Sequence, residues 1–96
     1  MVERTFGFRP GQIVVAEAGR EAGHCFVVVG LDAAFLYLAD GDKRPLERPK
    51  KKNPRHVRVL SGVDAHLPAP PFTNRAIREA LRAVEGGGRE TWPSKT

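Results

Sequence analysis

Short apolar runs separated by glycine, proline and charged residues make up the first sixty positions of the chain. Most of these runs are rich in valine, leucine and aromatic residues and are bounded by turn-forming residues, as is typical of β-strands. The pattern predicts five strands, at residues 12–16, 24–31, 35–39, 44–47 and 55–60. Asp40-Gly41 is the strongest hairpin signal among the connections. Five short strands joined by tight turns predict a mainly β fold, a small five-stranded antiparallel barrel.

The strand predicted at residues 24–31 is apolar on both faces. Cys25, Val27 and Val29 alternate with Phe26 and Val28, so neither side of the strand is polar. Such a strand is either covered on both sides or part of a sheet that curves into a closed barrel. The glycine at position 30 would permit the bend that closure requires.

The apolar period changes after a proline-rich connector. Ile77, Leu81 and Val84 are spaced as on one face of a C-terminal α-helix, and Thr73 or Asn74 is its expected N-cap. A run of three glycines ends the predicted helix. The predicted organisation is a β domain at residues 1–62, a connector at 63–72, a helix at 73–86 and a flexible tail at 87–96.

The composition favours a reducing compartment. The chain has 96 residues and one cysteine, so no intramolecular disulfide can form, although small secreted domains usually need several. Residues 1–10 lack the pattern of a signal peptide, and the apolar run at 25–31 is too short to span a bilayer. We therefore expect a cytoplasmic protein that does not contact membranes.

Positive charge is concentrated in one segment, residues 43–58. Eight lysine and arginine residues stand there against Glu47, so the segment carries +7 while the whole chain carries +5. Such a concentration is typical of a phosphate-binding surface. The alternative is a solvated loop that keeps the chain soluble. The alternation of charged and apolar residues at 55–60 favours an ordered strand, and hence the binding surface.

Residues 11–31, GQIVVAEAGREAGHCFVVVGL, resemble the KOW motif, in which two strands flank a glycine-containing loop. The resemblance continues through Asp32, Phe35-Leu36, Asp40-Gly41, the basic segment, and Asn53 with Arg55-His56-Val57. Over residues 10–60 the chain is similar to the L-fourteen-e family of large-subunit ribosomal proteins and to short bacterial KOW-domain RNA-binding proteins.

The resemblance implies an SH3-like barrel of the KOW type that binds structured RNA, above all ribosomal RNA, without catalysis. Gly23 then corresponds to the structural glycine of the KOW loop. The implied RNA-binding residues are Arg20, His24, Lys43, Arg44, Arg48, Lys50, Lys51, Lys52, Arg55, His56 and Arg58. Prolines interrupt the basic segment, so we expect a basic loop at residues 49–54 to supply contacts. The short helix replaces the family's long basic extension, so both a ribosomal and a ribosome-associated role remain open.

Other chemistry is not indicated by the sequence. His24 and Cys25 are adjacent on a strand and point to opposite faces, so they cannot act as a base and its nucleophile, and Cys25 is expected to be a buried apolar residue. The three histidines lack the spacing of a zinc site. We therefore expect no enzymatic activity, no metal and no other cofactor.

Most of the aromatic side chains among Phe26, Phe35 and Tyr37 are expected to be buried, with one exposed. The expected partners are RNA and neighbouring ribosomal proteins, and the chain is expected to be monomeric when it is not bound to RNA. The expected mechanism is electrostatic capture of phosphates together with recognition of RNA shape. The alternative function is a KOW-type protein-interaction module that docks on RNA polymerase or a translation factor.

Overall fold

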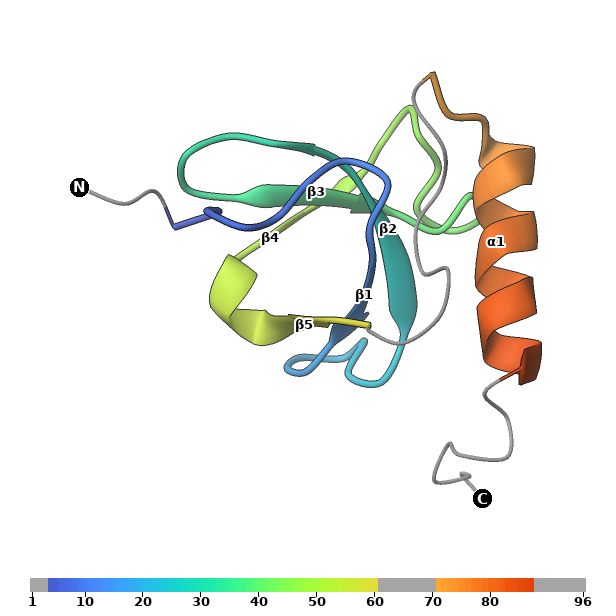
Figure 1. Ribbon diagram of the computed structural model, residues 1–96, viewed down its shortest axis with the longest axis horizontal. Helices are drawn as coiled ribbons and strands as arrows, with labels where there is room; N and C mark the ends of the chain where they lie inside the picture. Colours follow the sequence, from blue (N-terminus) through green and yellow to red (C-terminus); the bar gives the residue numbers. More distant parts are fainter. Residues whose placement is uncertain (1–3, 61–70, 88–96) are drawn as a thin grey trace.

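A computed structural model describes residues 4–60 and 71–87, which form one antiparallel sheet and one helix (Figure 1). The strands are β1 (Ile13–Ala16), β2 (Cys25–Leu31), β3 (Leu36–Ala39), β4 (Lys50–Lys52) and β5 (Val57–Val59). The 3-10 helix η1 (Pro54–His56) connects β4 to β5, and α1 spans Asn74–Gly87. The mainly β fold with a C-terminal helix is confirmed. Of the flexible tail predicted at 87–96, Gly87 is instead the last residue of α1, and residues 88–96 and most of the predicted connector lie outside the described residues.

The sheet has the order β4-β3-β2-β1-β5, so β4 and β5 are its edges. In Figure 1, β3 and β4 run across one end of β1 and β2, and β5 runs across the other, which makes the sheet strongly curved. The register between β2 and β3 shifts between Val28 and Gly30, at the glycine for which a bend was predicted.

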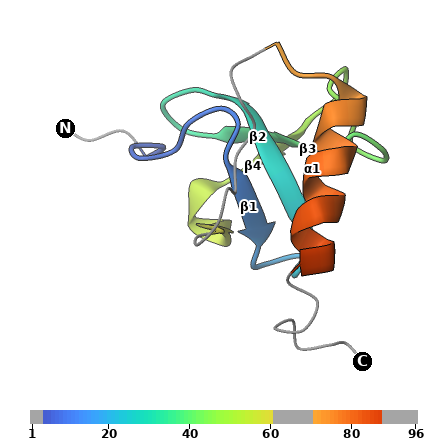
Figure 2. The same cartoon turned by 45° about the vertical axis from the view of Figure 1, so that its right-hand side comes forward.

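Both faces of the curved sheet are covered, which explains the apolar character of both sides of β2. On the outer face, Cys25 and Val27 pack with Ile77 and Leu81 of α1, which lies beside β2 (Figure 2). A second cluster fills the concave face. Its buried members are Val14, Ala16, Phe26, Val28, Leu36, Leu38 and Val57. The predicted burial of Cys25 is confirmed.

The prediction of the fourth strand was wrong. Residues 44–47 form turns, because the Asp40 carboxylate accepts the N–H of Arg44 at 2.8 Å and Pro45 has no N–H to donate to a neighbouring strand. The fourth strand is instead Lys50–Lys52, within the segment predicted as a basic loop, and it pairs with β3 from Leu36 to Leu38. Lysines suit this position because β4 is an edge strand, where charge prevents further strand pairing.

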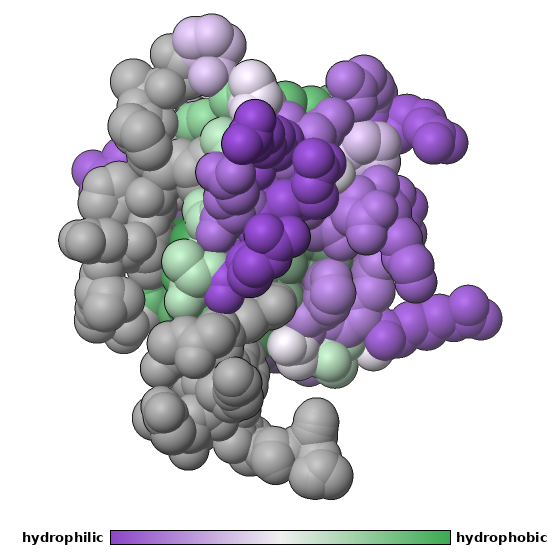
Figure 3. Space-filling model, turned by 90° about the vertical axis from the view of Figure 1, so that its right-hand side faces the viewer, coloured by the Kyte–Doolittle hydropathy of each residue, from purple (hydrophilic) through white to green (hydrophobic). Residues whose placement is uncertain are grey.

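The fifth strand is shorter than the predicted 55–60. The Asn53 side chain accepts the N–H of Arg55 at 2.9 Å and begins η1, so regular pairing starts only at Val57. The helix agrees with its prediction. The Thr73 hydroxyl accepts the N–H of Ala76 at 3.0 Å, as an N-cap does, and α1 ends at Gly87. The outward face of α1 is predominantly hydrophilic (Figure 3).

Candidate nucleic-acid interface

The loop between β1 and β2, residues 17–24, is a closed turn. Its ends are joined by the hydrogen bond from Gly23 N–H to the Ala16 carbonyl, at 2.7 Å. Gly23 has a positive φ, +89°. A Cβ at this position would meet no atom within 4 Å, so glycine is required for its backbone angle and not for space. The turn leaves Arg20 and His24 exposed to solvent.

The basic segment returns to this loop. The Glu21 carboxylate lies between two cations from the segment, 3.4 Å from Nε of Arg44 and 3.5 Å from Nζ of Lys50. Lys52 Nζ also donates to the Ala18 carbonyl at 3.1 Å. Two segments that are more than twenty residues apart in sequence therefore form one surface.

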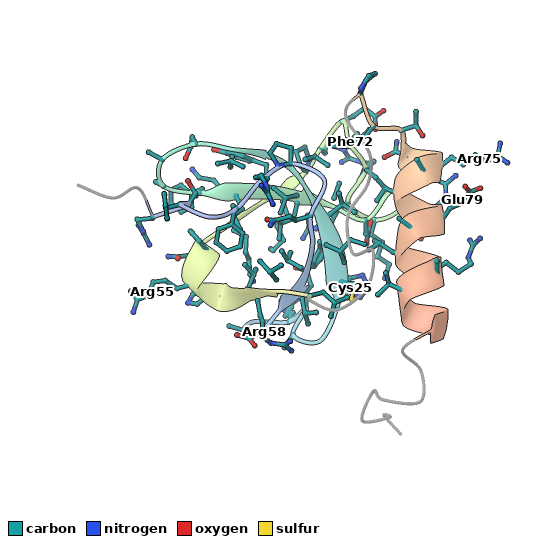
Figure 4. All side chains as sticks on the ribbon, in the orientation of Figure 1. Cys25, Arg55, Arg58, Phe72, Arg75 and Glu79 are labelled. Carbon is teal, nitrogen blue, oxygen red and sulfur yellow. The ribbon has the colours of Figure 1, made fainter. Side chains whose placement is uncertain are left out.

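Strand β5 adds a further contact to the same loop. Arg58 Nε donates to the Glu17 carboxylate at 2.7 Å, and the Glu17 N–H donates to the His56 carbonyl at 2.7 Å. Arg55 is exposed on η1, and Figure 4 shows Arg55 and Arg58 on the side of the molecule away from α1. We use the name loop surface for the exposed and half-exposed cations gathered around the β1–β2 loop. They are Arg20, Arg44, Lys50, Lys52 and Arg58.

The loop surface is positive, but less so than the sequence suggests. Its five cations face two carboxylates, those of Glu17 and Glu21, which leaves an excess of three positive charges. Arg44 and Arg58 each donate a hydrogen bond to these carboxylates through Nε only. Among the described residues, no partner accepts a hydrogen bond from their terminal amino groups, and the side chains of Arg44 and Arg58 are 40% and 57% exposed. These amino groups are thus available to a further anion.

His24 lies at the border of this surface. Its Nε2 is 3.3 Å from the Asp40 carboxylate, and its ring packs edge-on against Phe26. Partial burial opposes ionisation of Asp40, but hydrogen bonds from the backbone N–H groups of Arg44 and Asp42 and from His24 outweigh it and lower the pKa of the carboxyl group. His24 therefore links the β1–β2 loop to the end of β3.

The structure does not bring every predicted cation to the loop surface. Lys51 points to the opposite face of β4 from its two neighbours, because side chains alternate along a strand. Lys43 and Arg48 are exposed on the β3–β4 loop, and within the described part of the chain no hydrogen bond or ion pair joins them to the β1–β2 loop. The β3–β4 loop instead contacts the start of α1, where the Asn74 side chain accepts the Leu46 N–H at 2.8 Å.

Three residues of functional interest were missed from the sequence. Glu17 and Glu21 position cations, and their only signal was their place in or just before the stretch bounded by Gly19 and Gly23. Phe6 is 78% exposed, and its only signal was the glycine that follows it. None of the three has a motif that would distinguish it from an ordinary surface residue.

Across residues 4–60 and 71–87, no group of three or more histidine, cysteine or acidic residues could hold a metal ion. Within the same residues, no helix is long and apolar enough to cross a membrane. No protein-family model matches this sequence, and a search of the curated proteins finds no match.

Proposed function

We propose that this chain is a non-catalytic RNA-binding protein whose loop surface contacts the phosphates of structured RNA. The expected target is ribosomal RNA, and the expected role is that of a cytoplasmic ribosomal or ribosome-associated protein. The observation that carries the proposal is the convergence of the β1–β2 loop and the basic segment on Glu21. The KOW resemblance implies RNA contacts in both segments, and the fold makes them neighbours.

The fixed positions of the cations support binding more than simple solubility. A solvated charge run leaves long side chains free to move, whereas Glu21 holds Arg44 and Lys50 and the Ala18 carbonyl holds Lys52. Ordering such a side chain at an interface costs about 0.5–1.5 kcal/mol, and part of that cost is already met in the free protein.

The unused donors of the arginines suit phosphate. With Nε of Arg44 and Arg58 directed at carboxylates, each guanidinium still presents terminal amino groups to solvent. Such groups make short, charge-assisted hydrogen bonds to phosphate oxygens. These contacts carry no base information, so RNA shape must supply the specificity.

The curvature of the sheet supports an SH3-like barrel of the KOW type as the finer description of the fold. The two edge strands, β4 and β5, are consecutive in sequence and are separated only by Asn53 and η1. The buried cluster led by Phe26, Leu36 and Leu38 fills the concave side between them. In a barrel of this kind the β1–β2 loop projects from one end, where a folded RNA can reach it.

A charge-matched pair of variants tests the proposal. Arg20→Gln/Arg44→Gln removes two positive charges from the loop surface, and Arg75→Gln/Arg82→Gln removes two from the exposed face of α1. Affinity for folded ribosomal RNA fragments should be measured over a series of salt concentrations. We expect the loop variant to bind more weakly, with a log–log salt slope that is shallower by roughly 0.7–0.9 for each phosphate that is no longer neutralised, and the helix variant to match wild type.

Equal losses of affinity in the two variants would mean that RNA responds only to net charge, and the loop surface would then not be a binding site. Wild-type protein without salt-dependent RNA affinity would refute the proposed function itself. Sedimentation of cell extract through a sucrose gradient separates the two expected roles, because a ribosomal component stays with the subunits at high salt and an associated factor is released.

A further inference from the structure

Phe6 is the one large hydrophobic side chain that is exposed among the residues the structure describes. It occupies the corner of a tight turn in which the Phe8 N–H donates to the Thr5 carbonyl at 3.0 Å. Gly7 follows with φ of +94°, as the third position of a type II turn requires. The ring therefore projects from a defined turn.

The turn is anchored on both sides of Phe6. Thr5 is 1% exposed, and its hydroxyl donates to the Asp32 carbonyl at 2.6 Å. The Arg4 N–H donates to the Ala33 carbonyl at 3.0 Å, and Phe8 packs against the concave cluster. Figure 1 shows this N-terminal segment beside the β2–β3 turn. The fold thus fixes the backbone that carries an exposed apolar ring, although the ring contributes little to the core.

The surroundings of this turn are cationic. The partly exposed ring of Phe35 has Lys51 Nζ 4.5 Å from its centre and the Arg4 guanidinium carbon at 5.9 Å. The carboxylate of Asp32 lies nearby and offsets one of the two positive charges; its oxygens accept the N–H groups of Ala34 and Phe35 and the Tyr37 hydroxyl, all within 2.9 Å. We use the name aromatic corner for Phe6, Phe35, Arg4 and Lys51.

We propose that the aromatic corner binds an unpaired base of the RNA, with the base stacked on Phe6 and the adjacent phosphates contacted by Arg4 and Lys51. The inference rests on the proposed function and adds to it the class of RNA, one with an unpaired nucleotide beside a helical segment. The two cations lie over the ring of Phe35, and Arg4, which is two positions before the exposed Phe6, is anchored on Ala33, two positions before Phe35. An exposed ring together with nearby cations is the combination used for single strands, because every base has a face to stack and a phosphate to neutralise.

A protein partner fits the corner less well. Protein docking sites are contiguous apolar patches of a few hundred Å². Here the exposed neighbours of Phe6 in sequence, Arg4, Gly7 and Arg9, are charged or lack a side chain, and Phe8 and Phe35 are only partly exposed, so charge interrupts the apolar surface. Strand β4 contributes to both proposed RNA contacts, one on each of its faces. Lys51 faces the aromatic corner, while Lys50 and Lys52 face the β1–β2 loop.

Two variants of Phe6 and two RNA probes test the inference. Phe6→Leu keeps an apolar side chain but removes the ring, and Phe6→Tyr keeps the ring. The probes are a single-stranded oligouridine and a fully paired RNA duplex. Phe6→Leu should lower the affinity for the single strand by about fivefold or more, corresponding to about 1 kcal/mol or more per stacked base. Its affinity for the duplex and its salt slope should not change, and Phe6→Tyr should match wild type.

Undiminished single-strand affinity in Phe6→Leu would overturn the inference, and so would an equal decrease on the duplex. Thermal unfolding identifies any general structural effect, since an exposed substitution changes stability by no more than about 0.5 kcal/mol. The two failures are distinguishable. If wild type binds RNA and Arg20→Gln/Arg44→Gln weakens it while Phe6→Leu does not, only the stacking proposal fails. If wild type binds neither probe, the proposed function fails and the stacking proposal fails with it.

Discussion

Replacement of Gly41 by alanine should destabilise the fold strongly, because this glycine sets how closely α1 approaches the sheet. Gly41 has φ of +80° and is buried. A Cβ built on it would lie 2.5 Å from the Asn74 carbonyl oxygen and 2.8 Å from Cγ of Arg78, both in the first turns of α1. Arg78 also donates from Nη1 to the Gly41 carbonyl at 2.8 Å. Both the Cα and the carbonyl of Gly41 therefore lie against α1.

Two costs add in Gly41→Ala. The left-handed conformation costs alanine about 1–2 kcal/mol, of which about 0.4–1 kcal/mol is offset by the lower entropy of the unfolded chain. The contact with backbone of α1 cannot be relieved by a side-chain rotation, and forcing extra atoms into a packed site costs about 1–3 kcal/mol. We expect a decrease of about 2–4 kcal/mol in the free energy of unfolding.

Gly23→Ala is the matched control. Gly23 has nearly the same φ, +89°, but open space around the added methyl group. Only the conformational cost remains, about 1 kcal/mol after the entropic offset. Urea and thermal unfolding of both variants, followed by far-UV circular dichroism, measure the difference. At about 4–8 °C per kcal/mol for a domain of this size, Gly41→Ala should melt clearly below Gly23→Ala. Equal melting temperatures would show that Gly41 does not pack against α1.

Contacts of β4, Asp40 and Ile77 support three further predictions. Lys50→Gln/Lys52→Gln should make the salt slope shallower for paired and unpaired RNA, whereas Lys51→Gln should affect only unpaired RNA; equal profiles would show that β4 does not separate two surfaces. The pKa of Asp40 is lower in the folded chain than its ordinary 3.8, so its stabilising effect is complete above that pH and is lost as the pH falls through the lower folded value. Asp40→Asn should therefore flatten the acid decline of the urea midpoint, and an unchanged decline would contradict this role. Ile77→Ala, at a fully buried position, should cost about 2–5 kcal/mol in unfolding free energy and leave the salt slope unchanged; a shallower slope would place RNA contacts on α1.

The sequence predicted the elements whose positions are determined by burial. Strand β2 and helix α1 have apolar periods because Val27 on one and Ile77 on the other pack together, so pattern and packing agree. Strand β4 could not be found in this way. Three consecutive lysines have no apolar period, and they form a strand only because β3 presents an unpaired edge after the Asp40–Gly41 turn. That pairing is a tertiary effect, which outweighs local preference.

The prediction of ion pairs from the sequence is limited in a similar way. The sequence shows that the basic segment is the main source of positive charge, but it does not show that two carboxylates outside the segment fold back onto its cations. Glu21 reaches Arg44 across 23 positions, and Glu17 reaches Arg58 across 41. A count along the chain cannot detect such pairs, because a fold that brings the cations to one loop also brings the acids of that loop to the cations.

Glu17 and Glu21 have opposing effects on the proposed RNA contact. Each reduces the field that attracts a polyanion and lowers the number of counterions released on binding. Each also separates like charges that would otherwise repel one another, and it fixes an arginine by Nε while the terminal amino groups stay exposed. The first effect lowers nonspecific attraction to any nucleic acid. The second favours an RNA whose phosphates match the fixed donors, so the two carboxylates would shift the balance from affinity toward selection of RNA shape.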